Sequence, residues 1–353
     1  MVKNRIHAAI AGATGFVGLD LINILSNHPN VIIRYLCAQK NLGKKINSFD
    51  KRIKKKLPKI SNLKKVNWEQ IDVLFLSLPN GEAQKIINKL YLKYKHLKFV
   101  DLSADFRLKN FNTFRKYYGK VHKAKKLIKK SIYSISELKK DNLKKFRIIS
   151  NPGCYPTSVQ IPLIPLLKKK IIKERNIIID SKSGYSGAGK NYKKKFNYKN
   201  FDFSTYAYSV NSHRHEAELY QEFKIINKKI KFIFNPHLIP TFRGILSSIY
   251  VEKNKNISVK SITNVLKKFY RKNFFIKINK HNSPLGTGNV INTNYCHISI
   301  CQPQDPNKVL ILSAIDNLIK GAAGQAVQNM NIIFNYNEQR GLNWTNYLYY
   351  CLF

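Results

Sequence analysis

Short apolar segments alternate with longer segments of helical periodicity over the first part of the chain. The segments expected to form strands are residues 6–11, 31–37, 73–78 and 99–102. Helical patterns follow the first strand and occupy residues 82–92. Strands that alternate with helices in this way are typical of a parallel sheet covered by helices. The pattern therefore predicts an α/β fold for this part of the chain.

A turn with three glycines joins the first expected strand to the first expected helix. Its sequence, GATGFVG over residues 12–18, has the spacing G-x-x-G-x-x-G, a variant of the dinucleotide-binding fingerprint. Glycines let the backbone approach a pyrophosphate, and the following helix N-terminus stabilises its negative charge. The position between a strand and a helix makes this a strong signal for a Rossmann-type site. The residues expected to contact the cofactor here are Gly12, Thr14, Gly15, Phe16, Val17 and Gly18.

The residues after the second expected strand bear on the choice between NAD and NADP. An NAD site usually has an acidic residue there, which binds the ribose 2′-hydroxyl. This chain has Ala38, Gln39 and Lys40 instead, and further lysines follow at positions 44 and 45. Lysines can face a 2′-phosphate, so the sequence favours NADP, with Lys40 as a contact. The alternative is that these lysines belong to the general lysine excess of the chain.

The octapeptide SNPGCYPT, residues 150–157, places Cys154 on a tight turn between an expected strand at 146–149 and an expected helix at 157–167. Near a helix N-terminus, unpaired N–H groups and the helix dipole favour the reactive thiolate over the thiol. From an unperturbed pKa of ~8.5, a fall of ~2 units would make the thiolate the major form at neutral pH. The alternative is a small buried core cysteine. The prolines and the glycine that flank Cys154 favour a nucleophile over a core cysteine.

A thiol nucleophile needs a proton acceptor, and the segment HRHEAE at residues 213–218 supplies one at an expected helix start. His213 is the expected acid/base because imidazole titrates near neutral pH. His215 lies on a different helical face and is expected to be structural. Glu218 could fix the substrate or an arginine, or be solvated.

Four further segments carry candidate ligand contacts. DLSADFRL starts at Asp101, at the end of an expected strand, where parallel sheets bind ligands. The segment 183–190 is rich in Gly and Ser without Walker A spacing, and is either an anion cradle or a plain surface loop. Arg243 lies in a Gly/Pro turn before an expected strand at 245–251, which hints at fork-shaped recognition of a carboxylate or phosphate. The small residues of an expected helix at 317–330 allow close approach of another backbone or the cofactor.

Composition limits the function classes. The chain has 353 residues, enough for two domains with substantial cores. Its net charge of +44 comes mainly from lysines and accompanies abundant Asn and Ile. Basic surfaces bind nucleic acid, but no RNA- or DNA-binding motif accompanies this charge. Biased coding is the simpler explanation, so no specific nucleic-acid partner is expected.

Cysteine usage and hydropathy bear on disulfides, metal sites and location. The five cysteines are odd in number and include no C-x-x-C, which argues against a disulfide framework and against a zinc site. No metal ligand set is therefore expected. No apolar run approaches the ~20 residues needed to span a bilayer, and the N-terminus lacks a signal peptide pattern. The expectation is a cytoplasmic protein with no membrane partner.

Taken together, these motifs resemble those of the N-acetyl-gamma-glutamyl-phosphate reductases, a family within the semialdehyde dehydrogenase superfamily. The resembling segments, in the family's order, are GATGFVG at Gly12, DLSADFRL at Asp101, SNPGCYPT at Ser150, SGAGK at Ser186, HRHxxE at His213, PHLIPTFRGIL at Pro236 and NLIKGAAGQAVQNMN at Asn317. The lysine-rich segments lie outside the resemblance. Ala217 stands where the family usually has Pro, and Asn80 stands where it usually has His. Asn80 puts any catalytic use of that position in doubt.

The resemblance implies a Rossmann-type NADP-binding domain, an inserted α+β catalytic and dimerisation domain, and a C-terminal helix that returns to the first domain. The implied boundaries are 1–150 plus 317–353 for the first domain and 151–316 for the second. A homo-oligomer, dimer or tetramer, is implied as well. Cys154 carries over as nucleophile and His213 as acid/base. Further contacts are expected from Ser103, Asn317 and Gly321 to NADP and from Arg107, Ser183, Glu218 and Arg243 to the substrate.

The implied reaction is the NADPH-dependent reduction of N-acetyl-L-glutamyl 5-phosphate, a small acyl phosphate, to N-acetyl-L-glutamate 5-semialdehyde and phosphate in L-arginine biosynthesis. It runs through a thioester on Cys154. Aspartate-semialdehyde or glyceraldehyde-3-phosphate dehydrogenases share the thiol chemistry but lack the HRHxxE and SGAGK pair. A basic RNA-binding module is the rival from another class. Loss of bound nucleic acid at moderate salt, with NADPH binding retained, would distinguish the enzyme from it.

Overall fold

The computed structural model describes residues 5–190 and 204–342. These residues form two compact units. The first unit comprises Met1–Pro152 and Ala322–Phe353, and the second comprises Gly153–Gly321. The chain therefore passes between the units at Pro152/Gly153 and at Gly321/Ala322, a few residues beyond the boundaries expected from the sequence.

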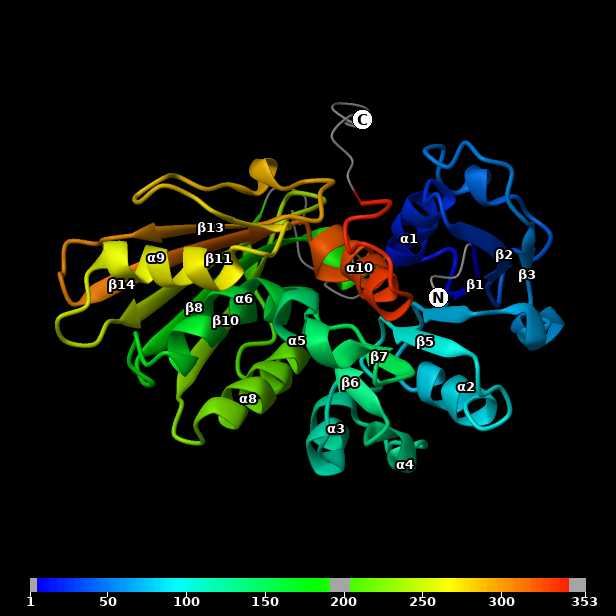
Figure 1. The fold of residues 1–353 in the computed structure, drawn as a ribbon, viewed down its shortest axis with the longest axis horizontal. Helices are drawn as coiled ribbons and strands as arrows, with labels where there is room; N and C mark the ends of the chain where they lie inside the picture. Colours follow the sequence, from blue (N-terminus) through cyan, green and yellow to red (C-terminus); the bar gives the residue numbers. More distant parts are fainter. Residues whose placement is uncertain (1–4, 191–203, 343–353) are drawn as a thin grey trace. The chain divides into compact units, whose positions relative to one another are not determined.

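A parallel seven-stranded sheet forms the centre of the first unit (Figure 1). Its strands are β1 (Ile6–Ala11), β2 (Val31–Cys37), β3 (Ile60–Ser61), β4 (Val73–Leu76), β5 (Lys98–Asp101), β6 (Ser131–Tyr133) and β7 (Ile148–Ser150). Their order in the sheet is β3-β2-β1-β4-β5-β7-β6, and every pair is parallel. The 3-2-1-4-5 arrangement is that of a Rossmann sheet, so the prediction of this fold is confirmed.

Helices bury the strands of this sheet on both faces, and all four residues of β4 are buried. The helices of the first unit are α1 (Phe16–Ser26), α2 (Glu82–Leu90), α3 (Phe111–Tyr118), α4 (Lys125–Ile128), α5 (Ser136–Leu143) and α10 (Gly324–Ile333). Apolar residues of α2 and α4 pack in one core cluster with alternate residues of β1, β4 and β5. Helix α10 contacts α1, α5 and β5. The C-terminal helix thus belongs to the first unit, as the resemblance implied.

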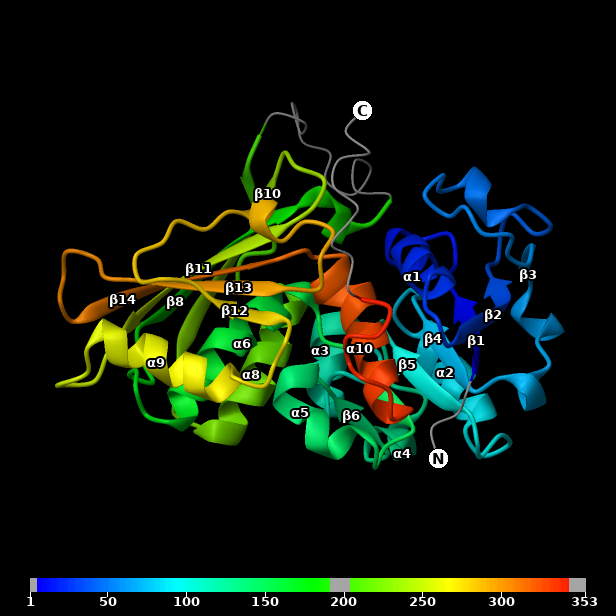
Figure 2. The same ribbon diagram turned by 45° about the horizontal axis from the view of Figure 1, so that its top comes forward.

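A mixed seven-stranded sheet forms the second unit, with the order β12-β13-β14-β11-β8-β10-β9 (Figure 2). Its strands are β8 (Ile177–Gly184), β9 (Tyr206–Ala207), β10 (Phe232–Ile239), β11 (Ile245–Glu252), β12 (Ile276–Ile278), β13 (Cys296–Cys301) and β14 (Lys308–Ile315). Its helices are α6 (Cys154–Lys168), α8 (Arg214–Ile226) and α9 (Val259–Tyr270). Helix α6 packs on β11 and β14 and contacts both α8 and α9. This is the expected α+β arrangement.

Helix α6 begins at Cys154, three residues before the expected start, and contains Pro162 and Pro165. A proline within a helix lacks the N–H that would bind the carbonyl four residues earlier. Pro165 therefore leaves the carbonyl of Ile161 without its helical partner. The hydroxyl of Tyr270, the last residue of α9, donates to that carbonyl at 2.5 Å. A contact between two helices thus replaces the bond that the proline removes.

Candidate active site

The turn between β1 and α1 has the geometry that a dinucleotide pyrophosphate requires. Gly12 has φ of +86°, and a Cβ there would lie 2.0 Å from the carbonyl oxygen of Ser77. A Cβ at Gly18 would lie 2.2 Å from the carbonyl oxygen of Gly12, so the glycine lets α1 pack against the turn. Gly15 is the N-cap of α1. The cradle therefore fits a nicotinamide dinucleotide, with Thr14, Phe16 and Val17 in the same segment.

Lys40 follows the end of β2 by three residues, and its side chain is exposed. The carboxyl end of a central strand is the edge at which Rossmann sheets bind their ligands. The NADP contact expected from Lys40 stays a prediction.

The end of β5 is organised by a fully buried carboxylate, Asp101. The hydroxyl and amide of Ser103 donate to Asp101 Oδ1 at 2.6 and 2.9 Å, and the amide of Phe106 donates to Oδ2 at 3.3 Å. Burial, together with the neighbouring Asp105 carboxylate, raises the pKa of Asp101 to about 7. The hydroxyl of Ser103, expected to contact the cofactor, is thus bound to this loop.

Asp105 has a role that sequence reasoning missed. Its carboxylate accepts the amide of Gly81 at 2.7 Å and the amide of Gln84 at 3.0 Å. Gly81 is the N-cap of α2 and has no side chain to cap the helix. A carboxylate 24 residues further along the chain therefore caps α2. No signal in the sequence points to so remote a cap.

Arg107, expected to bind substrate, is buried and donates to backbone carbonyls. Its Nε donates to the carbonyl of Asn151 at 2.8 Å, and its Nη2 donates to the carbonyl of Leu102 at 3.0 Å. Asn151 also receives a bond from Asn329 Nδ2 at 3.0 Å and donates its side-chain amide to Ala322 at 3.0 Å. These contacts hold the segment two residues before Gly153. These contacts favour a structural function for Arg107, which holds the residues just before the turn in place.

Cys154 is the first residue of α6 and is half-buried. A Cβ at Gly321 would lie 2.6 Å from Cys154 Cβ, so only glycine admits the cysteine there. A Cβ at Gly153 would lie 2.4 Å from His215 Nε2, so the imidazole packs directly on the turn. The amide of Gly153 donates to Glu218 Oε2 at 2.9 Å. Glu218, expected to touch substrate, thus binds the turn that carries the thiol.

His213 is the N-cap of α8. Its Nδ1 accepts the backbone amide of His215 at 3.1 Å, and its Nε2 lies 3.1 Å from the hydroxyl of Tyr208. The two imidazole rings are 4.8 Å apart, and the ring of Tyr155 contacts both edge to face. The second unit therefore gathers Cys154, its neighbour Tyr155 and both histidines, and the predicted acid/base role of His213 stays a prediction.

Two tyrosines near these histidines were missed in the sequence. The hydroxyl of Tyr155 donates to the carbonyl of His237 at 2.9 Å, and the hydroxyl of Tyr208 lies 3.4 Å from that of Tyr155. Burial is the main cause that raises the pKa of each tyrosine above its ordinary value. The position of Tyr155 directly after the cysteine was the one available signal for its proximity.

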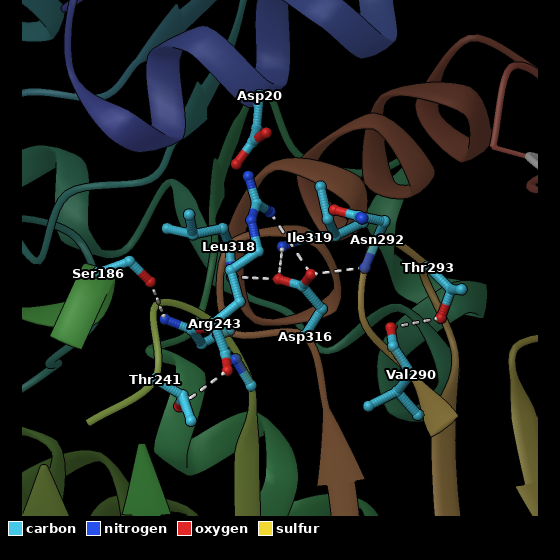
Figure 3. A network of polar contacts seen from close by, with 12 residues as sticks. Asp20, Ser186, Thr241, Arg243, Val290, Asn292, Thr293, Asp316, Leu318 and Ile319 are labelled. Atoms are coloured by element: carbon cyan, nitrogen blue, oxygen red, sulfur yellow. Dashed lines mark hydrogen bonds and ion pairs between the residues drawn. The ribbon is translucent and has the colours of Figure 1, made fainter. Parts of the chain in front are cut away.

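A buried aspartate, Asp316, organises the loop after β14 (Figure 3). The amides of Leu318 and Ile319 donate to its Oδ1 at 2.8 and 3.0 Å, and the amide of Asn292 donates to Oδ2 at 2.8 Å. Arg243 Nη1 lies 3.4 Å from Oδ2, and the arginine side chain is 10% exposed. Asp316 thereby fixes the guanidinium that the sequence singled out for anion recognition.

Asn317 and the loop after β8 are joined to the Arg243 turn. Asn317 Oδ1 accepts the amide of Gly244 at 2.8 Å, and its Nδ2 donates to Ser186 Oγ at 2.9 Å. Ser183, buried, donates its hydroxyl to the carbonyl of Gly184 at 3.0 Å. The segment 183–190 is thus a packed part of the second unit up to Ser186. Asn317, which the sequence predicts as an NADP contact, is thus hydrogen-bonded to both the loop after β8 and the Arg243 turn.

The part of the chain that the structure describes contains no group of three or more His, Cys, Asp or Glu side chains placed to hold a metal ion. Among the same residues, no helix has the length and apolar character to cross a membrane.

Two known protein domains match most of the chain. The semialdehyde dehydrogenase NAD binding domain model matches residues 7–146, and the semialdehyde dehydrogenase dimerisation domain model matches residues 154–317. The chain is 40% identical over 343 residues to the N-acetyl-gamma-glutamyl-phosphate reductase of Ehrlichia canis, covering 96% of this chain and 98% of the relative. It is 39% identical over 342 residues to a probable chloroplastic N-acetyl-gamma-glutamyl-phosphate reductase of Arabidopsis thaliana, covering 96% and 84%.

Solved structures share the fold at much lower identity. Aspartate semialdehyde dehydrogenase II of Vibrio cholerae complexed with ASA superposes with a TM-score of 0.72 at 16% identity, covering 94% of this chain and 99% of that one. Aspartate semialdehyde dehydrogenase of Candida albicans with NADP superposes with a TM-score of 0.65 at 17% identity, covering 93% of this chain and 98% of that one. The two domain models and the relatives near 40% identity show that the chain belongs to the N-acetyl-gamma-glutamyl-phosphate reductase family of semialdehyde dehydrogenases.

Proposed function

We propose that this protein catalyses the NADPH-dependent reduction of N-acetyl-L-glutamyl 5-phosphate to N-acetyl-L-glutamate 5-semialdehyde and phosphate, a step of L-arginine biosynthesis. The observation that carries the proposal is the half-buried thiol of Cys154 at the first residue of α6. It lies in a chain about 40% identical to enzymes named for this reaction.

Cys154 is the proposed nucleophile. It starts a 15-residue helix, where the helix dipole and unpaired N–H groups favour the thiolate. The sulfur forms a bond to the acyl carbon, and the bond from that carbon to the phosphate oxygen breaks. Phosphate leaves with that electron pair and takes up a proton from water, and a thioester on Cys154 remains.

The glycine turn at residues 12–18 is proposed to hold NADPH, because the space that a Cβ would fill at Gly12 and Gly18 is taken by backbone. When bound, NADPH supplies the hydride that converts the thioester acyl group into the aldehyde. Lys40 is proposed to bind the 2′-phosphate. The remaining proposed contacts of the cofactor are Thr14, Gly15, Phe16, Val17, Ser103, Asn317 and Gly321.

His213 is the proposed catalytic residue at the acyl oxygen of the substrate, where its Nε2–H acts as a hydrogen-bond donor. Negative charge develops on the acyl oxygen when the thiolate adds and again when the thioester is reduced. An N–H aimed at that oxygen stabilises both states. Collapse of the second oxyanion restores the C=O bond and returns the electron pair of the C–S bond to sulfur, so this step consumes no proton from the protein.

Arg243 is the proposed receptor for an anionic group of the substrate, with Asp316 holding its guanidinium. Ser183 lies in the neighbouring loop and is proposed to support the same site. Arg107 and Glu218 are also proposed to bind the substrate. In the structure, Arg107 donates to the carbonyl of Asn151 and Glu218 accepts the amide of Gly153, so both also hold the turn before Cys154.

The exposed face of the second sheet is the proposed interface of a homo-oligomer. Ile233 pairs with Ile178 across β10 and β8, and Ile178 pairs with Tyr250 across β8 and β11. These three side chains are 62%, 43% and 43% exposed. Apolar side chains in one row across three strands support burial against a second copy, and the matched model is that of a dimerisation domain.

A cytoplasmic location is proposed because the nucleophilic thiol must stay reduced. Among the described residues, Cys37, Cys154, Cys296 and Cys301 form no disulfide.

The reaction is tested in reverse, because acyl phosphates are labile. Purified protein is given N-acetyl-L-glutamate 5-semialdehyde, phosphate and NADP, and NADPH formation is followed by the near-ultraviolet absorbance of the reduced cofactor. We expect phosphate-dependent turnover, higher efficiency with NADP than with NAD, and loss of turnover in Cys154→Ser with NADPH binding retained. Higher efficiency with L-aspartate semialdehyde, or substantial activity of Cys154→Ser, would contradict the proposal.

A further inference from the structure

We infer that Tyr208 is a positioning residue for His213, through a hydrogen-bond chain that runs in one direction from a backbone amide to a backbone carbonyl. The chain links the amide of His215, the ring of His213, the hydroxyls of Tyr208 and Tyr155, and the carbonyl of His237. All five residues belong to the second unit. The inference rests on the proposed function, in which His213 serves the reaction as a donor.

Both ends of this chain have a fixed polarity. The backbone amide of His215 can only donate, so His213 Nδ1, 3.1 Å away, must present its lone pair. The carbonyl of His237 can only accept, so the hydroxyl of Tyr155, 2.9 Å away, must donate to it. These two constraints come from the backbone and do not depend on how any side-chain hydrogen is placed.

The groups between the ends then have one consistent arrangement. A neutral imidazole whose Nδ1 accepts carries its proton on Nε2, so Nε2–H of His213 donates to Tyr208 Oη at 3.1 Å. The hydroxyl of Tyr208 donates in turn to Tyr155 Oη at 3.4 Å. Each hydroxyl accepts one bond and donates one. The chain therefore selects the Nε2–H tautomer of His213 and gives that proton an acceptor.

Packing holds the same geometry. The rings of Tyr208 and Tyr155 contact the His213 ring edge to face, with centroids 5.3 and 5.4 Å away. Burial, in the first place, raises the pKa of Tyr208, and the nearby Cys154 thiolate acts in the same direction. Tyr208 therefore keeps its hydroxyl proton, and the direction of the chain is preserved while Cys154 is ionised.

This arrangement gives His213 a defined chemical state before the reaction. Its Nδ1 lone pair accepts the backbone amide at the start of α8. Its Nε2–H donates to the hydroxyl of Tyr208, and a substrate oxygen can replace that hydroxyl as the acceptor. His213 thus rests as a donor for the developing oxyanion rather than as an acceptor for the thiol proton. Tyr208 keeps the donor aimed without touching the reacting atoms.

The test compares Tyr208→Phe with Tyr220→Phe in the full-length protein. Tyr220 lies on α8 and packs against Phe232, so its substitution removes a hydroxyl from the same unit outside the chain. We expect Tyr208→Phe to lower kcat about 10-fold with KM within about twofold, because aiming of the donor affects the transition state more than substrate binding. Tyr220→Phe should stay within about twofold in both.

A second measurement does not depend on turnover. Nitrogen NMR of imidazole-labelled protein, with the His213 signals assigned by their loss in His213→Asn, should show Nε2 protonated and Nδ1 unprotonated in the wild type. In Tyr208→Phe the Nε2 proton should exchange with water faster. A proton found on Nδ1 in the wild type, or equal kcat for the two phenylalanine variants, would overturn the inference.

The measurements of turnover also distinguish a failure of this inference from a failure of the proposed function. Absence of phosphate-dependent NADP reduction in the wild type would refute the function, while the NMR arm would still decide the state of His213. If His213→Asn keeps kcat within a few-fold while His215→Asn is severely impaired, the histidine roles are exchanged and the inference is wrong. The expected result is a loss of about 10²–10³-fold for His213→Asn, the range found when a donor to a developing oxyanion is removed.

Discussion

At the scale of single residues, the turn before the thiol depends on what two glycines admit. Gly153 admits the His215 ring and Gly321 admits Cys154 itself. Each approach is closer than any side chain would allow, so a methyl group at either position would displace the groups around the sulfur. The motif shows the glycines, but the partner that each one admits comes from another segment of the chain.

The ionisation of Asp101 opposes folding. Its pKa of about 7 in the folded protein lies above the ordinary value of 3.8, because the carboxyl is buried beside Asp105. Between these two values the folded state binds the proton and the unfolded state has lost it. The stability that this group contributes is therefore fully present below pH ~4 and is lost as the pH rises toward ~7.

We expect Asp101→Asn to remove this loss. The free energies of unfolding of wild type and variant are measured in urea from pH 4 to pH 8, and their difference is compared. The stability of the wild type should fall relative to that of the variant by up to about 4 kcal/mol as the pH rises from ~4 to ~7, about 1.4 kcal/mol for each unit of pH. A difference that stays constant across this range would show that Asp101 does not titrate as stated.

At the scale of elements, α6 shows how tertiary contacts repair a helix that local rules oppose. Its two internal prolines remove backbone donors, yet it continues for 15 residues from Cys154. The apolar pattern outweighs the prolines because nearly the whole helix is buried between the sheet, α8 and α9. The hydroxyl of Tyr270 supplies one of the missing donors.

Tyr270→Phe should therefore destabilise the protein by about 1–3 kcal/mol, since it leaves the buried carbonyl of Ile161 without that donor. Tyr220→Phe is again the control, with an expected change below about 0.5 kcal/mol. Both are measured by urea unfolding at one pH. Equal stability of the two variants would mean that another group satisfies the carbonyl.

At the scale of the whole molecule, the exposed row of Ile233, Ile178 and Tyr250 predicts self-association. Ile178→Lys places a charge at the centre of this row, and we expect the mass measured by light scattering after gel filtration to fall. Ile225→Lys is the control, because Ile225 is 58% exposed and lies on α8. An unchanged mass for Ile178→Lys would remove this face from the interface.

The Rossmann alternation, the glycine turn, the cysteine at a helix start and the family could all be predicted from the amino-acid sequence, because each depends on local periodicity or on residues adjacent in the chain. Strand limits such as Ile245–Glu252 and the start of α8 after His213 were predicted nearly in place for the same reason. Propensity and turn chemistry act over a few residues, and a single chain displays them directly.

The hydrogen-bond partners of the site residues became visible only in the folded protein. Asp105 caps a helix that precedes it, Arg107 binds the carbonyl of Asn151, and Glu218 binds the amide of Gly153. The sequence predicts that Arg107 and Glu218 contact the substrate, and this stays a prediction; the sequence did not show these backbone partners, since a charged residue in a motif shows its chemistry but not its direction. Hydrogen-bond partners separated by 24 to 65 residues are set by how the strands and helices pack, and no local pattern encodes that packing.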